Sequence, residues 1–189
     1  MSSAPDYPQP ISGWRVWLVA EVEGKARLLS VYYHVPWPVR RELVGECLAR
    51  RGRFRLPGWR AGAEGHATPG ERCACGIYAA REPSSAIDYL RTYGTRSVRE
   101  VEGWPVVHRV LGRVLLWGRL VECEAGWRGA RAYPEHLFLP ERSWSGRLLE
   151  RLEDIAFSLA NYAIPIEILD GVGCEEELME ALRERAPAA

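Results

Sequence analysis

The chain has 189 residues, of which 47% are hydrophobic and 26% are charged, so it can bury a core and is not disordered overall. Its 25 basic and 25 acidic side chains cancel to a net charge of zero, which excludes a uniformly basic nucleic-acid binder but not a local basic patch. The basic side chains are 24 arginines and Lys25, a bias typical of a GC-rich genome.

The first ten residues lack the pattern of a signal peptide, and the chain has no apolar run of 18 residues that would span a membrane. The cysteines are an odd, sparse set: Cys47, Cys73, Cys75, Cys123 and Cys174. In a chain without an export signal, such a set indicates reduced thiols. We therefore expect a cytoplasmic protein without a disulfide framework.

The first third of the chain predicts a hairpin and a helix. Residues 14–22 alternate between apolar and polar, and a turn at 23–25 leads into a second strand over 26–35. Pro38 suits the first turn of a helix, which would carry an apolar stripe of Leu43, Val44, Cys47 and Leu48. An arginine- and glycine-rich loop is expected over 50–72.

The rest of the chain predicts four further strands and three helices. The expected elements are a strand at 75–80, a helix at 83–90, a strand at 106–124, a turn at 125–126, a strand at 127–133, a connector at 134–140, a helix at 144–162, a strand at 165–169 and a short acidic helix at 178–182. Strict alternation of strand and helix is missing, which disfavours a Rossmann fold.

We therefore expect an α+β fold with a curved sheet, mainly antiparallel or mixed, which could approach a barrel, and three to four helices. The expected organisation is a flexible tail over 1–12, a single domain over 13–170 with its long loop, and an acidic helix and tail over 171–189.

A candidate metal site consists of Cys47, His66, Cys73 and Cys75. Thiolate and imidazole are the ligands that zinc selects, and a Cys3His set would fasten the long loop to the sheet. The Cys-x-Cys spacing is compatible with zinc but not diagnostic of it. Two alternatives remain: buried core cysteines with an exposed His66, or a catalytic thiol with a histidine base.

Charge is distributed unevenly along the chain. Residues 40–60 contain seven arginines and two glutamates, a balance of +5, whereas residues 167–185 contain seven acids and two arginines, a balance of −5. Because arginine contacts phosphate and aromatic rings stack on bases, Arg51, Arg53, Arg55 and Trp59 are candidate nucleic-acid or nucleotide contacts. Alternatively, the two segments are solvated or neutralise each other.

The second predicted hairpin contains a candidate catalytic group. Glu122 and Glu124 could act as acid and base, with Arg128 and Arg131 as anion ligands and Trp117 and Trp127 as lining aromatic residues. If the turn consists of Ala125 and Gly126, Arg131 lies diagonal to Glu122 on one face. Cross-strand salt bridges account for the same charged residues more simply.

Several catalytic motifs are absent from the sequence. It contains no G-x-x-x-x-G-K-[ST], G-x-G-x-x-G, G-x-S-x-G or H-E-x-x-H pattern. The marks of P-loop nucleotide hydrolysis, dinucleotide redox chemistry, the hydrolase elbow and zincin proteolysis are therefore missing.

Four short motifs carry a resemblance: Cys75–Ala79, Leu116–Arg119, Gly126–Arg128 and Ala132–Pro134. Their combination resembles a group of proteins from high-GC, actinobacterial-type bacteria for which no activity is assigned, so the resemblance implies no catalytic residues. The long strand with its following hairpin is also faintly similar to PUA- and ASCH-like barrels. That similarity implies binding of RNA or modified bases, although a fold likeness does not carry function.

These observations favour a non-enzymatic binding module that engages nucleic acid, a nucleotide or a partner protein through an arginine and aromatic surface. The alternatives are a small enzyme with a cleft at the second hairpin, and a metal-stabilised regulatory interaction protein. Zinc is the one cofactor that the sequence suggests.

Overall fold

The structure is a computed structural model that describes residues 6–47, 66–92, 100–140, 152–172 and 175–185. Its elements are β1 (Asp6–Val22), β2 (Lys25–Ser30), β3 (Leu43–Val44), β4 (Ile77–Ala80), α1 (Pro83–Thr92), β5 (Glu100–Val101), β6 (Trp104–Cys123), β7 (Gly126–Pro140), α2 (Leu152–Leu159), the 3-10 turn η3 (Ala160–Tyr162), β8 (Ile166–Leu169) and α3 (Glu175–Glu184). The α+β class is confirmed.

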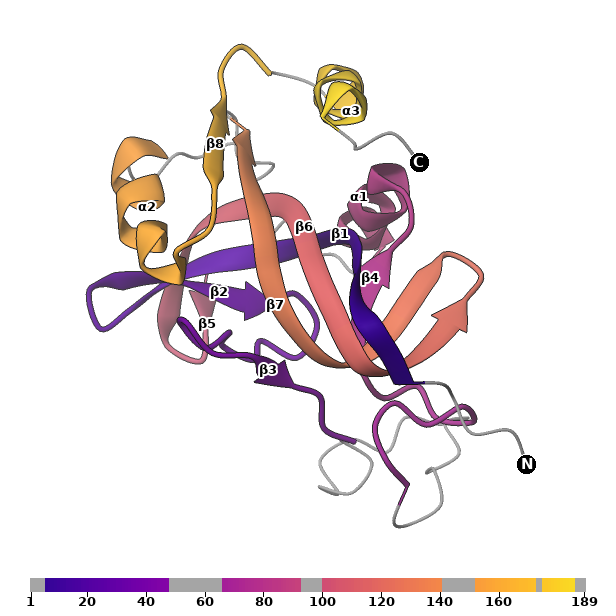
Figure 1. Ribbon diagram of the computed structural model, residues 1–189. Coiled ribbons are helices and arrows are strands. Elements are labelled where there is room, and N and C mark those ends of the chain that lie inside the picture. Colours follow the sequence, from indigo (N-terminus) through magenta and orange to yellow (C-terminus); the bar gives the residue numbers. More distant parts are fainter. Residues whose placement is uncertain (1–5, 48–65, 93–99, 141–151, 173–174, 186–189) are drawn as a thin grey trace.

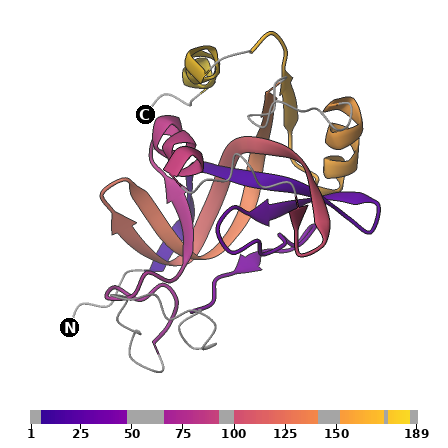
Figure 2. The ribbon, with the colours of Figure 1, turned by 180° about the vertical axis from the view of Figure 1, so that it is seen from behind.

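Three long antiparallel strands form the framework of the sheet (Figures 1 and 2). β1 pairs with β6 from Asp6 opposite Arg119 to Ala20 opposite Val106, and β6 pairs with β7 through the hairpin. β4 bridges β1 and β7, so the pairings run from β1 through β4, β7 and β6 back to β1. β8 lies alongside β7 and pairs with it in the parallel direction. The sheet is therefore curved and partly ring-like.

The two faces of the sheet bury separate apolar cores. The first core contains Trp17, Val110 and Leu116 and is covered by α2 through Leu152, Ile155 and Leu159. The second core is covered by α1 and α3, which lie on the other side of the molecule from α2 (Figures 1 and 2). Because Leu178 and Leu182 of α3 are buried in this second core, the acidic helix packs onto the domain through its apolar side.

The outer edge of β2 is closed by side chains of the helical segment α2–η3. The backbone N–H of Ala26 donates to Ser158 Oγ at 2.8 Å, and that of Leu28 donates to the Tyr162 hydroxyl at 3.1 Å. The same hydroxyl donates to the Trp37 carbonyl at 2.9 Å. An unpaired strand edge is a template for pairing with another chain, and these contacts occupy its donors.

Two predictions about the helix and the connector are wrong. Residues 38–47 do not form a helix, because Leu43 and Val44 pair as β3 with β7. Residues 134–140 are not a connector but the second half of β7. Pro134 pairs with Val114 directly beside a register shift between β6 and β7, and proline in strands is found at such irregularities.

The domain boundaries also differ from the expectation at the N-terminus, because β1 begins at Asp6 and residues 6–12 belong to the sheet. Residues 50–65 of the predicted loop and 144–151 of the predicted helix lie outside the described residues. In the described part of the chain, no helix is long and apolar enough to cross a membrane.

Candidate metal centre

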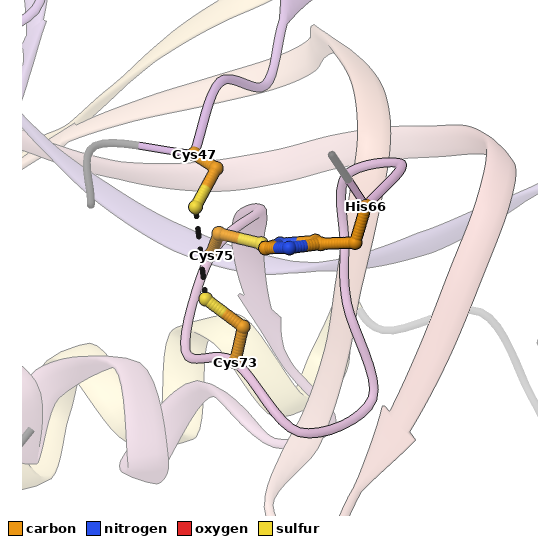
Figure 3. A group of neighbouring side chains, drawn as sticks. All are labelled: Cys47, His66, Cys73 and Cys75. Atoms are coloured by element: carbon orange, nitrogen blue, oxygen red, sulfur yellow. Dashed lines mark hydrogen bonds between the residues drawn. The ribbon is translucent and has the colours of Figure 1, made fainter. Parts of the chain in front are cut away.

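Four potential metal ligands lie together at one end of the sheet (Figure 3). Cys47 Sγ, a ring nitrogen of His66, Cys73 Sγ and Cys75 Sγ are all within 4.8 Å of one another, and the group could hold a metal ion. We call these four residues the Cys3His group. All four residues proposed from the sequence as metal ligands are therefore neighbours in the fold.

Strand β7 brings the two halves of the group together. β3 pairs with β7 at Ala132 and Arg131, and the N–H of Gly45 continues this pairing to the Ala130 carbonyl at 2.7 Å. β4 pairs with the adjacent stretch of β7, from Gly126 to Gly129. Cys47 follows β3 and Cys75 precedes β4, so both cysteines lie beside the same part of β7.

The side chains of the Cys3His group are in direct contact with one another. Cys47 Sγ and Cys73 Sγ are 3.7 Å apart, along the dashed line in Figure 3, and His66 Nε2 is 3.2 Å from Cys75 Sγ. The ring of His66 points toward Cys75. Cys47 is buried and the other three residues are half-buried, so the group is partly accessible to water.

The thiols of Cys73 and Cys75 have different acidities. Burial raises the pKa of Cys75, which also accepts a hydrogen bond from the N–H of Gly70 at 3.2 Å. Burial also opposes ionisation of Cys73. Hydrogen bonds from the Cys75 backbone and from neighbouring thiols, together with the charge of Arg128, outweigh it and lower the pKa of Cys73. Cys73 is therefore the readier of the two to supply a thiolate, the form that binds metal.

A cavity of about 530 Å³ adjoins the Cys3His group. It is lined by residues 44–47, residues 66–68, Ala130 and Arg131. Arg131 is half-exposed on its wall and forms an ion pair with Glu42. Its guanidinium is therefore already neutralised by a neighbouring carboxylate.

The predicted catalytic group of the second hairpin does not assemble. The turn consists of Glu124 and Ala125, one residue earlier than predicted, so Glu122 pairs with Trp127 and not with Gly129. Glu122 instead forms an exposed ion pair with Arg81 at 2.6 Å. Arg131 lies four residues further along β7, opposite Trp117. Glu122 and Arg131 thus have separate partners and do not line one cleft.

The remaining residues that the sequence analysis proposed as ligand contacts do not form one common surface among the described residues. Trp127 is partly buried and packs against the first core, with the guanidinium of Arg81 4.5 Å from its ring centre. Arg128 is buried rather than available as a surface anion ligand. Arg51, Arg53, Arg55 and Trp59 lie outside the described residues.

The sequence analysis missed the position of Arg128 beside the Cys3His group. Its Nη1 donates to the carbonyl oxygens of Gly70, Cys73 and Cys75, directly behind two of the four potential ligands. A weak sequence signal exists in the glycines that flank the cysteine pair, Gly70 and Gly76, since glycine permits close approach of other groups to the backbone.

Comparisons of the chain with protein-family models, curated proteins and solved structures found no match. The function is therefore argued from the site itself.

Proposed function

We propose that this protein is a zinc-stabilised binding module in which Cys47, His66, Cys73 and Cys75 hold one Zn²⁺. The observation that carries the proposal is the mutual proximity of the four ligand atoms, all within 4.8 Å. Two thiolates on a tetrahedral zinc, each bound at about 2.3 Å, lie about 3.8 Å apart. The separation of 3.7 Å between Cys47 Sγ and Cys73 Sγ fits that geometry.

The donor set favours zinc over other common ions. Thiolate and imidazole are poor ligands for magnesium and calcium, which prefer oxygen. Four protein ligands occupy every position of a tetrahedral ion, whereas catalytic zinc sites keep a position open for water or substrate. The proposed role is therefore structural: the ion joins the segment after β3 to the segment before β4.

Metal analysis of the purified protein tests the site. Mass spectrometry under native conditions should detect one zinc per chain, and Co²⁺ substitution should give the absorption bands of a tetrahedral thiolate site. Cys73→Ser should abolish binding. Cys123→Ser is the matched control: Cys123 is a free cysteine outside the Cys3His group, and serine keeps an acceptor for the Nε of Arg128, so this variant should bind zinc like the wild type.

A wild-type protein that takes up no zinc when reconstituted, or a Cys73→Ser variant that binds it as tightly, would overturn the proposal.

We further propose that the module binds single-stranded nucleic acid through residues 48–65. The specific observation is one of position, because two of the four ligands, Cys47 and His66, immediately flank this segment. The segment contains five arginines and one glutamate, together with Phe54 and Trp59. Arginines that contact phosphates and aromatic rings that stack on bases are the usual components of such surfaces. The similarity to PUA- and ASCH-like barrels, which stays a prediction, is in line with RNA as the ligand.

Binding to short single-stranded RNA and DNA, measured across a series of salt concentrations, tests this second proposal. Each lost phosphate contact lowers the slope of log K against log salt by about 0.7 for single strands. Changing Arg51, Arg53 and Arg55 together to Ala should therefore weaken binding and lower the slope by about 2. Arg27, Arg81 and Arg183 changed together to Ala remove the same charge elsewhere and serve as the control.

The nucleic-acid proposal is overturned if the wild type binds neither RNA nor DNA at low salt, or if both triple variants lose affinity equally. If the protein binds no nucleic acid but captures a partner protein, the nucleic-acid proposal is replaced by the alternative of a partner-protein module.

A further inference from the structure

We infer that Arg128 is the positioning residue of the metal centre, and that it supplies the positive charge that balances the zinc–thiolate group. The inference rests on the proposed zinc site and assigns a role to a residue outside its four ligands. Arg128 lies on β7 opposite Tyr78 of β4, only 6% exposed, and so in the part of the sheet that adjoins the ligand segments.

The guanidinium of Arg128 holds the backbone that carries two ligands. Its Nη1 donates to the carbonyl oxygens of Gly70 at 3.3 Å and Cys75 at 3.0 Å, and also to that of Cys73. Its Nε donates to Cys123 Sγ at 3.4 Å. One side chain thus fixes three carbonyl groups within residues 70–75, and with them the directions from which Cys73 and Cys75 approach an ion.

Arg128 is also a buried cation that needs a counter-charge. Among the described residues, no carboxylate forms an ion pair with it: Glu71 lies near Arg119, and Glu122 pairs with Arg81. Burying a charge without a partner of opposite sign is costly. Three thiolates, a neutral imidazole and Zn²⁺ carry one net negative charge, which the guanidinium would cancel.

Two glycines permit this close packing. A Cβ at Gly70 would lie 2.6 Å from Cδ2 of His66. A Cβ at Gly76, whose φ is +117°, would lie 2.9 Å from Pro69 Cβ and 3.3 Å from Arg128 Cβ. A side chain at Gly70 would therefore displace the ligand His66, and one at Gly76 would press against Arg128. The sequence around the cysteine pair is therefore suited to a segment wrapped around an arginine.

A pair of matched variants separates charge from hydrogen bonding. Arg128→Gln keeps N–H donors but removes the charge, whereas Arg128→Lys keeps the charge. Arg131→Gln is the control, since Arg131 lines the adjoining cavity and pairs with Glu42. Zinc affinity is measured by competition with a chromophoric chelator, and the site is monitored by its Co²⁺ spectrum.

We expect Arg128→Gln to weaken zinc binding 10- to 100-fold, the range typical for residues behind metal ligands. Arg128→Lys should recover most of that loss, and Arg131→Gln should bind zinc like the wild type. Urea unfolding in EDTA shows whether the variants merely destabilise the fold, since a positioning role predicts a smaller loss of stability in the apo-protein than in the zinc-bound protein.

Two results would overturn the inference while leaving the zinc site intact: wild-type affinity in Arg128→Gln, or equal losses in the Gln and Lys variants. An equal loss of stability in the apo- and zinc-bound forms would overturn it as well. A wild type that binds no zinc would instead overturn the proposed site.

Discussion

The interior of the sheet and the end that carries the Cys3His group are stabilised by different physical means. In the interior, Trp17 and Leu116 are completely buried between β1, β6 and α2, so removal of apolar surface from water stabilises the strands. At the ligand end, none of residues 66–76 belongs to either apolar core. Turns, carbonyl contacts to Arg128 and the four potential ligands hold that segment. The sheet should therefore fold without metal, whereas the ligand end should depend on it.

The largest expected loss of stability comes from shortening a side chain in the interior of the sheet. Trp17 is 0% exposed and meets Trp37 edge to face, with ring centres 5.4 Å apart. Changing a buried tryptophan to alanine costs about 3–5 kcal/mol. We expect Trp17→Ala to lower the free energy of unfolding by that amount, and equally with and without EDTA, because none of residues 66–76 belongs to the core that contains Trp17. Urea unfolding followed by circular dichroism measures it.

Phe157→Ala is the control for this truncation, since Phe157 is 85% exposed, and it should change stability by no more than about 0.5 kcal/mol. A Trp17→Ala loss that disappears when zinc is removed would contradict the independence of the two regions.

Removing the proposed zinc ion should destabilise the ligand end of the molecule and leave the interior of the sheet intact. A ligand present at about 1,000 times its dissociation constant stabilises the folded state by about 4 kcal/mol. EDTA should therefore lower stability by up to that amount while the far-ultraviolet circular dichroism of the sheet persists. Hydrogen exchange should become faster at residues 66–76 and leave β6 unchanged. Loss of protection throughout β6 would show that the interior also needs the metal.

Acid should weaken the interior through His108. Its imidazole is completely buried, and this burial, with a smaller contribution from the charge of Arg109, lowers the pKa of His108 to about 4. The unfolded chain, with a histidine pKa of about 6.5, then binds more protons than the folded chain between these values. The free energy of unfolding should fall as the pH drops from 6.5 to 4, by at most about 3 kcal/mol.

Measuring stability against pH in EDTA removes any contribution of a bound metal to this effect. His108→Leu eliminates the titrating group and should flatten the curve between pH 6.5 and 4. An unchanged slope in this variant would show that other groups carry the acid sensitivity.

The same contrast between local and long-range interactions explains what the sequence could predict. The strands β1 and β6 and the helices α1 and α3 follow from periodicity, which is a local property. The helix expected over 38–48 failed because a pairing of Leu43 and Val44 with β7, remote in the chain, outweighed their helical spacing. The second half of β7 was missed because prolines such as Pro134 usually end a strand, whereas here the strand continues past a bulge beside Pro134.

The Cys3His group could be predicted because only a few side chain types bind zinc, so their chemistry limits the choice. The role of Arg128 could not, since it depends on three carbonyl groups more than fifty residues away in sequence. Likewise, a shift of one residue in the turn separated Glu122 from Arg131 and removed the predicted catalytic group. Chemistry identifies ligands, but register decides which residues meet.

The smallest expected effect concerns the edge of β2, where the interior meets solvent. Tyr162→Phe removes the hydroxyl that accepts from the N–H of Leu28 and donates to the Trp37 carbonyl. Leaving buried polar groups unpaired costs about 1–3 kcal/mol. Ser158→Ala frees only the half-buried N–H of Ala26 and should cost about 1 kcal/mol. Both losses should be the same with and without EDTA, since this edge belongs to the interior. If Tyr162→Phe is neutral while it increases dimer formation, the hydroxyl protects the edge from pairing more than it stabilises the fold.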